Sequence, residues 1–344
     1  MDQIFYIAAR SQEKNGGIYG YGQDDGHSCE QVFFTPLKGV SYLAYSPKRR
    51  YLYAVYKEGT ANKVASYDLS DDSTLVFMNS VETHGESSCH ITTDPACRYL
   101  YCANYTSGNL NEFKLENGSF TGEGRMITYS GKLGPNRRRQ EHTHAHCVRF
   151  TPDYNYLCLV DLGLDEVLLF RFTPEKGIEN TPAFRYRGIA GSGPRHILFS
   201  PDGRHAWLAN EVDNTVSVLE YADGTLKHVS TLSTLPEGLK FKGETKVAAL
   251  RLSPNGKHLL VSNRGYDSIA CYHVAPDASL TLYDIVNSYG SGPRDINFLP
   301  CGCMVAACNE LSGNVTFFRY DPDSGKLTYL LGEDVKIPGP LCVI

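Results

Sequence analysis

The chain has 344 residues, of which 42% are hydrophobic and 21% charged, so it is long enough for one large domain or two ordinary ones with a substantial core. The net charge of −5 argues against a nucleic-acid-binding protein, which usually carries a basic excess. No apolar run of about 18 residues occurs, which argues against a membrane-spanning helix.

The N-terminal segment and the cysteines indicate the cellular compartment. MDQIFYIAAR has no long apolar run behind a basic flank, so we predict no secretory signal. The 11 cysteines are odd in number and irregularly spaced, which fits reduced thiols better than a disulfide framework. We therefore expect a cytoplasmic protein.

Short runs of β-forming residues recur along the chain. Six prolines in similar turns mark the repeat: Pro47, Pro95, Pro152, Pro201, Pro254 and Pro300. Each follows a run such as AHCVRF (145–150) and precedes a second and a third run, such as NYLCLVD (155–161) and EVLLFRF (166–172). A weaker fourth run follows in most copies. Four short strands per unit of roughly 40–50 residues are typical of a propeller blade, and no long helical period is present.

The two ends of the chain complete a seventh unit. IFYIAAR (4–10) and GIYGYGQ (17–23) resemble the second and third strands of a unit, whereas GPLCVI (339–344) resembles an isolated first strand. Pairing of these segments would protect two open sheet edges. We predict an all-β, seven-bladed β-propeller with four antiparallel strands per blade, closed by the C-terminal strand and forming a single domain over residues 1–344.

Two positions of the repeat carry side chains that a packed propeller does not need. Six residues before the proline stand His146, Arg195 and Arg294. Ten residues after it stand Tyr105, Glu211, Arg264 and Glu310. The first two strands of a blade fold back on each other, so both positions lie at the same rim of the ring. We expect a polar pocket at that mouth of the central channel.

At these residues the chain resembles the lactonase family of seven-bladed propellers, which includes bacterial 6-phosphogluconolactonases and fungal carboxy-cis,cis-muconate cyclases. The resemblance extends over essentially the whole chain and is most specific in RRRQEHTHAHCVRFTPD, GSGPRHILFSPDGRHAWLANE and VSNRGYDSIACY. It implies that His146, Arg195, Glu211 and Arg264 form the active-site quartet. Tyr266 departs from the family pattern, because many relatives have histidine there.

Charge and resemblance together predict an enzyme that hydrolyses a small anionic sugar-acid lactone, with 6-phosphogluconolactone favoured, and that needs no cofactor, nucleic acid or membrane. Either Glu211 or His146 serves as the general base, while Arg195 and Arg264 bind the anionic group and the oxyanion. The further substrate-binding candidates are His144, His196, Arg294, Glu310, Tyr105 and Arg139. For Arg294 a structural role, anchoring hydrogen bonds between blades, is an equally good interpretation. Glu310 also fits a simple pairing with a neighbouring arginine, and Arg137–Arg139 also fit an ordinary solvated loop.

Three histidines, His142, His144 and His146, alternate in EHTHAH. On a strand they would share one face, where three imidazoles could bind zinc. The resemblance implies no essential metal, so we predict hydrogen-bonded pocket histidines and no metal site. Two other functions stay open: a lactonising enzyme of the muconate type, and a non-catalytic scaffold propeller. The Trp-Asp repeats typical of scaffold propellers are absent, since Trp207 is the single tryptophan.

Overall fold

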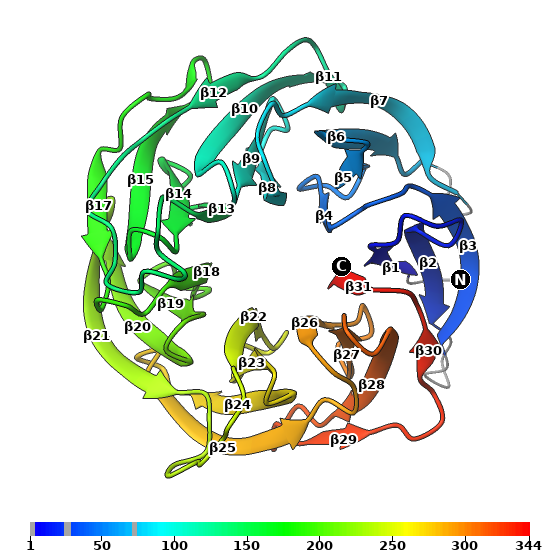
Figure 1. Cartoon of the computed structure of the whole chain (residues 1–344), viewed down its shortest axis with the longest axis vertical. Helices are drawn as coiled ribbons and strands as arrows, with labels where there is room; N and C mark the ends of the chain where they lie inside the picture. The colour runs from blue at the N-terminus through cyan, green and yellow to red at the C-terminus, as the bar shows by residue number, and fades with distance from the viewer. Residues whose placement is uncertain (1–3, 24–28, 71–73) are drawn as a thin grey trace. The chain divides into compact units, whose positions relative to one another are not determined.

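The computed structural model describes residues 4–23, 29–70 and 74–344. These residues form strands and turns without a helix, and so contain no helix that could cross a membrane. Their strands are arranged in seven antiparallel sheets, labelled along the chain in Figure 1. The predicted all-β fold with seven blades is therefore confirmed.

Six sheets are continuous in sequence, and in each of them consecutive strands pair. The first two contain β4 (Tyr42–Tyr45), β5 (Tyr51–Glu58), β6 (Ala61–Asp68) and β7 (Val76–Glu82), then β8 (Ser88–Thr93), β9 (Tyr99–Asn104), β10 (Asn109–Glu116), β11 (Ser119–Phe120) and β12 (Arg125–Ile127). The next two contain β13 (Ala145–Phe150), β14 (Tyr156–Asp161), β15 (Glu166–Thr173), β16 (Gly177–Ile178) and β17 (Phe184–Arg187), then β18 (Pro194–Phe199), β19 (His205–Asn210), β20 (Thr215–Ala222) and β21 (Thr225–Ser233). The last two contain β22 (Lys246–Leu252), β23 (His258–Arg264), β24 (Ser268–Val274) and β25 (Leu280–Asn287), then β26 (Pro293–Phe298), β27 (Met304–Asn309), β28 (Asn314–Tyr320), β29 (Leu327–Tyr329) and β30 (Val335–Lys336).

The seventh sheet joins the two ends of the chain. Its strands run in the order β3 (Cys29–Pro36), β2 (Gly17–Gln23), β1 (Ile4–Ala9) and β31 (Pro340–Val343). Backbone hydrogen bonds between Tyr6 and Ile344, 2.9 and 3.0 Å long, extend the pairing of β1 with β31. The C-terminal strand thus supplies the missing first strand of the N-terminal blade, as the sequence predicts.

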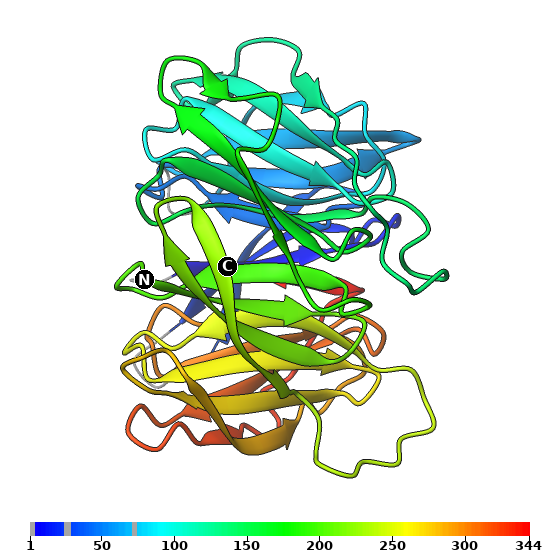
Figure 2. The same ribbon diagram turned by 90° about the vertical axis from the view of Figure 1, so that its left-hand side faces the viewer.

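The chain forms two compact units. The first comprises Met1–Ser41, Asn214–Val218 and Ser230–Ile344, and the second comprises Tyr42–Asp213 and Leu219–Val229. The single domain expected over residues 1–344 stays a prediction. Within the first unit, the long connection between β21 and β22 loops away from the strands, in yellow-green in Figure 2.

Strand β14 shows how the sequence pattern builds the core. All of its residues are buried, because successive side chains point to opposite faces and both faces are covered. Leu157 and Leu159 pack with residues of β9 and β10 on one face. Cys158 and Val160 pack with residues of β18 and β19 on the other face. The sheets are therefore stabilised by burial against their neighbours, at about 25 cal/mol per Å² of apolar surface.

Asparagines that end second strands form buried hydrogen bonds to the neighbouring strand. The Asn104 amide donates to the side-chain oxygens of Asn109 and Asn111, each at 2.7 Å. In another blade, the Asn309 amide donates to the Thr316 hydroxyl at 3.1 Å. These buried side chains hold the second strand to the third at its end.

Candidate active site

A β-bulge lies near the start of the first strand in several blades, and the candidate residues occupy it. In β13 and β18 the pairing register shifts between Ala145 and Cys147 and between Pro194 and His196. The extra residues are therefore His146 and Arg195. A bulge leaves its extra residue out of the regular alternation and redirects its side chain. The same β-bulge therefore recurs in both blades, but its extra residue is a histidine in β13 and an arginine in β18.

Glu211 is the centre of a buried charged cluster in the second unit. It directly follows β19, and its backbone N–H donates to the Gly193 carbonyl at 2.7 Å, beside the β18 bulge. Its Oε2 atom lies 3.0 Å from Nε of Arg195 and 3.9 Å from Nε2 of His146, while its Oε1 atom accepts from Arg139. Glu211 and Arg195 are each 3% exposed, and His146 is 4% exposed. The structure therefore brings Arg139, His146, Arg195 and Glu211 together.

Each oxygen of the Glu211 carboxylate faces a guanidinium, so the buried negative charge is compensated. Burial by itself would lower the pKa of Arg139, but the attraction of Glu211 and a hydrogen bond with Tyr105 raise it. Burial raises the pKa of Tyr105, although Arg139 opposes that change. Arg139 therefore carries a permanent positive charge at this site.

Aromatic rings and imidazoles pack around the charged cluster. Tyr105 stacks on His144 at a ring distance of 4.3 Å and meets His146 edge to face at 5.4 Å. His146 and His196 are also in edge-to-face contact, at 5.5 Å. A guanidinium nitrogen of Arg195 lies 3.0 Å from Nε2 of His196. The substrate-binding candidates Tyr105, His144 and His196 thus all adjoin the cluster.

Two neighbouring residues were missed by sequence reasoning. The imidazole of His90 on β8 packs against His196 at 5.4 Å and against Tyr42 on β4 at 4.5 Å. His90 and Tyr42 occupy the position five residues before the repeat proline, which is also the position of His196. Comparing the residues at this position of each repeat would have identified both.

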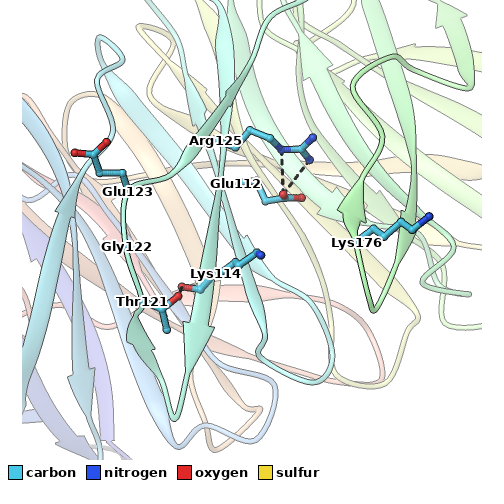
Figure 3. A pocket seen from close by; sticks show the side chains of 7 residues that line it. All are labelled: Glu112, Lys114, Thr121, Gly122, Glu123, Arg125 and Lys176. Atoms are coloured by element: carbon cyan, nitrogen blue, oxygen red, sulfur yellow. Dashed lines mark hydrogen bonds and ion pairs between the residues drawn. The ribbon is translucent and has the colours of Figure 1, made fainter.

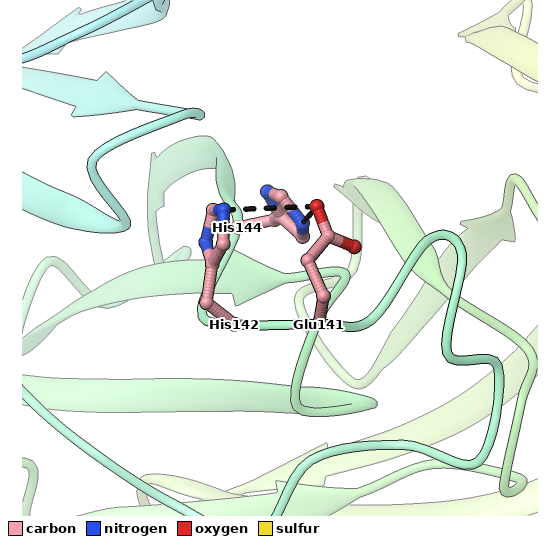
Figure 4. Close-up of side chains that lie close together, drawn as sticks. All are labelled: Glu141, His142 and His144. Atoms are coloured by element: carbon pink, nitrogen blue, oxygen red, sulfur yellow. Dashed lines mark ion pairs between the residues drawn. The ribbon is translucent and has the colours of Figure 1, made fainter.

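The predicted strand of alternating histidines is wrong. Strand β13 begins at Ala145, so His142 and His144 lie in the preceding segment and only His146 belongs to the strand. The backbone N–H of His144 donates to the Asp161 carboxylate at 3.1 Å, which diverts the chain from the sheet. His142 and His144 group with Glu141 (Figure 4), whereas His146 faces Glu211.

Asp161 positions this segment from the end of β14. Its Oδ1 atom accepts from the backbone of His144 and Leu164, and its Oδ2 atom accepts from the Tyr129 hydroxyl at 2.6 Å. Burial raises the pKa of Asp161 in spite of these hydrogen bonds. The carboxylate thus fixes the backbone that carries His144.

The other three candidates belong to the first unit. Arg264 ends β23 and donates to the Val247 carbonyl at 3.2 Å. Arg294 and Glu310 pair with each other at 3.4 Å, and substrate contact by either residue stays a prediction. In the same unit, Tyr266 meets Phe241 edge to face at 5.5 Å. The grouping of Arg264 with Glu211 stays a prediction.

A separate pocket of about 440 Å³ lies beside β10 and β12 in the second unit (Figure 3). Its buried carboxylate, Glu112, accepts hydrogen bonds from Arg125 at 2.9 Å, from the Tyr101 hydroxyl at 3.0 Å and from the backbone of Ile178 at 2.8 Å. These bonds hold strands together, so we assign this group a structural role.

Known proteins resemble the chain over its whole length. Residues 4–344 match the family described as lactonase, 7-bladed beta-propeller. A 6-phosphogluconolactonase of Bacillus subtilis is 32% identical over 347 residues, covering 99% of this chain and 97% of the relative. An uncharacterized protein of Staphylococcus epidermidis is 34% identical and covers 94% of both chains.

Solved structures agree with this result. The periplasmic gluconolactonase of Pseudomonas aeruginosa is 27% identical with a TM-score of 0.91, covering 99% of this chain and 98% of the other. A Lactobacillus plantarum protein is 30% identical with a TM-score of 0.90, covering 100% and 99%. Because the family match covers nearly every residue and full-length relatives exceed 30% identity, the chain belongs to the lactonase family of seven-bladed β-propellers.

Proposed function

We propose that this protein hydrolyses a sugar-acid lactone and that 6-phosphogluconolactone is its substrate. The observation that carries the proposal is the buried Glu211 carboxylate, held by Arg139 and Arg195 with His146 beside it. Lactone hydrolysis requires a base for the attacking water and positive charge for the developing oxyanion. The cluster contains both, and the similarity to the Bacillus subtilis enzyme supports the choice of substrate.

His146 is the proposed general base. Protonation of Glu211 would neutralise the carboxylate that pairs with two guanidinium groups, so Glu211 is a poor acceptor for the proton of water. An imidazole ordinarily titrates near pH ~6.5, which suits a base at neutral pH. At 3.9 Å from Nε2 of His146, the Glu211 carboxylate stabilises the imidazolium that forms. Glu211 therefore acts through His146 as a positioning residue.

In the proposed reaction, water adds to the lactone carbonyl carbon and gives its proton to His146. The carbonyl oxygen becomes an oxyanion, which Arg195 stabilises. The ring carbon–oxygen bond then breaks, and the ring oxygen takes the proton back from His146. The product is a hydroxy acid, whose new carboxyl group then releases its proton to solvent and becomes a carboxylate.

Arg139 is the proposed ligand of the substrate phosphate. Its side chain is 25% exposed, whereas that of Arg195 is 4% exposed, so Arg139 is the more accessible cation of the cluster. A planar guanidinium can bind a phosphate through two parallel hydrogen bonds. The family resemblance implies that Arg264 also belongs to the active-site quartet, and its role stays a prediction.

The test is hydrolysis of 6-phosphogluconolactone, unphosphorylated gluconolactone and muconolactone by the purified protein, measured above their spontaneous opening. We expect the phosphorylated lactone to have the highest kcat/KM, by at least about tenfold, which corresponds to about 1.4 kcal/mol. Exclusive turnover of muconolactone would favour a lactonising enzyme, and no turnover of any of the three would contradict the proposal.

Arg139→Lys tests the phosphate contact. The variant keeps the charge but loses the planar fork, so KM should rise more for the phosphorylated lactone than for gluconolactone. Arg185→Lys is a matched control, because Arg185 pairs with a buried carboxylate, Glu166, in an ion pair outside the cluster. An equal change in KM for both lactones in Arg139→Lys would contradict phosphate binding by Arg139.

A further inference from the structure

Glu141, His142 and His144 converge just before β13 in a group that the proposed reaction does not use as a unit (Figure 4). Oε1 of Glu141 lies 3.3 Å from Nε2 of His144 and 3.7 Å from Nε2 of His142. The two imidazole rings are 4.1 Å apart. His144 is buried, whereas His142 and Glu141 are about half exposed, so one side of the group is open to solvent.

The tautomers of both histidines follow from their neighbours. Nδ1 of His142 lies 2.7 Å from the Thr143 carbonyl oxygen, and Nδ1 of His144 lies 3.1 Å from the Tyr105 carbonyl oxygen. A carbonyl oxygen only accepts hydrogen bonds, so each Nδ1 must carry a proton. In the neutral imidazoles each Nε2 therefore presents a lone pair. Metal-binding histidines are commonly oriented in this way, with the second ring nitrogen donating to a carbonyl or carboxylate.

Three electron-pair donors thus lie within 4.8 Å of one another, and the two separations from Glu141 suit a metal ion. Zinc bonds of about 2.0–2.1 Å at a tetrahedral angle separate ligand atoms by about 3.3 Å. The two separations from Oε1 of Glu141, 3.3 and 3.7 Å, are close to this value. Nε2 of His144 is buried and makes no well-aligned hydrogen bond within the described residues. Such a convergence of lone pairs is repulsive unless a metal ion, or a proton on one of the imidazoles, occupies the space.

We propose that Glu141, His142 and His144 bind one divalent transition-metal ion of the zinc class. Two imidazoles and a carboxylate suit zinc, cobalt or nickel better than magnesium, which prefers oxygen ligands. The remaining coordination position opens to solvent and takes water or an anionic oxygen. This site is distinct from the Glu211 cluster, although His144 stacks on Tyr105 and so touches both. Its existence does not depend on the proposed reaction.

The experiment is titration of the full-length, chelator-treated protein with Co²⁺, followed by visible absorption. We expect one equivalent to produce the intense ligand-field bands of a tetrahedral site, Zn²⁺ to abolish them, and Mg²⁺ to leave them unchanged. The positions of the bands also distinguish imidazole and carboxylate ligands from cysteine thiolates, which add a charge-transfer band. Absence of these bands at one equivalent would overturn the proposal.

Variants locate the ion. His142→Ala and Glu141→Gln should weaken Co²⁺ binding by at least about tenfold, while circular dichroism shows that both remain folded. His84→Ala is the matched control, because His84 lies 3.6 Å from Glu82 without a second imidazole in that ion pair. Unchanged Co²⁺ affinity in folded His142→Ala, or an equal loss in His84→Ala, would also overturn the proposal.

Discussion

Single residues give this propeller its chemistry by departing from the packing rules of the repeat. Most first-strand and second-strand positions carry side chains that fill the space between sheets, whereas Arg195 and Glu211 are buried charges. Such groups are tolerated because they compensate each other at 3.0 Å. Removing one partner of a buried pair leaves the other uncompensated, so substitutions that keep size and hydrogen bonding give the clearest tests.

Glu211→Gln keeps the size of the side chain and removes its charge. We expect kcat to fall by about 10²-fold or more with a small change in KM, because the imidazolium of His146 loses its counter-charge during the reaction. Steady-state kinetics checks this. Glu166→Gln is the matched control, since Glu166 is also buried and paired with two arginines, Arg185 and Arg187. A normal kcat in Glu211→Gln would remove Glu211 from the mechanism.

The pH profile separates the two candidate bases. A base must be deprotonated to accept a proton, so kcat/KM should rise as the pH increases through the pKa of the base. With His146 as the base, His146→Asn should abolish this rise and Glu211→Gln should shift it to lower pH, because the carboxylate favours the imidazolium. Retention of the wild-type profile in His146→Asn would assign the base elsewhere.

At the scale of elements, bulges and turns decide which side chains meet. The segment 141–144 precedes β13 and lies against the turn that follows β14. The backbone N–H of Leu162 donates to the His144 carbonyl at 3.0 Å, and Asp161 accepts from the His144 N–H at 3.1 Å. Gly163 permits the close approach, because a Cβ atom there would lie 1.8 Å from the His142 carbonyl oxygen.

Gly163→Ala should therefore displace the segment 141–144. We expect a loss of unfolding free energy of roughly 1–3 kcal/mol, typical of overpacking, together with weaker Co²⁺ binding. Chemical denaturation and the cobalt titration measure the two effects. Gly122→Ala is the control, because a Cβ atom there meets nothing within 4 Å and should change neither quantity. A Gly163→Ala protein as stable as wild type would show that the segment adapts without cost.

At the scale of the whole molecule, the fold depends on a sheet made from both ends of the chain. Strand β31 contributes buried Leu341, Cys342 and Val343, and the Val343 N–H donates to the Asp295 carboxylate at 3.0 Å. The C-terminal residues therefore pair with β1 and also bind to β26. This arrangement covers edges of the N-terminal sheet and joins it to the last sheet that is continuous in sequence.

Deletion of residues 340–344 should destabilise the protein strongly. Loss of the buried Leu341 and Val343 side chains alone removes roughly 3–6 kcal/mol, at about 1.5–3 kcal/mol for each, which is a large part of a typical folding free energy. Thermal unfolding measures the change. A synthetic GPLCVI peptide added in trans should restore part of the stability. A truncated chain that melts like the full chain would contradict a stabilising role for β31.

The sequence by itself determined the architecture of this protein. The spacing of the prolines, the recurring runs of β-forming residues such as 156–161 and the half-units at both ends predict seven sheets and their closure. These features are visible because strand periodicity and turn residues act over a few neighbouring positions. The repeat register also identified the positions of His146, Arg195 and Glu211.

Only the tertiary structure decided which of these side chains meet and where a predicted strand does not form. The alternation in EHTHAH predicts one strand face, but the His144 N–H donates a hydrogen bond to the carboxylate of Asp161, 17 residues further along the chain, and this holds the histidine outside the strand. Arg139, from a turn, reaches Glu211 across 72 positions of the chain, and His90 packs against His196 across 106 positions. Contacts between residues so far apart depend on how the sheets pack, and local sequence preferences carry no information about that packing.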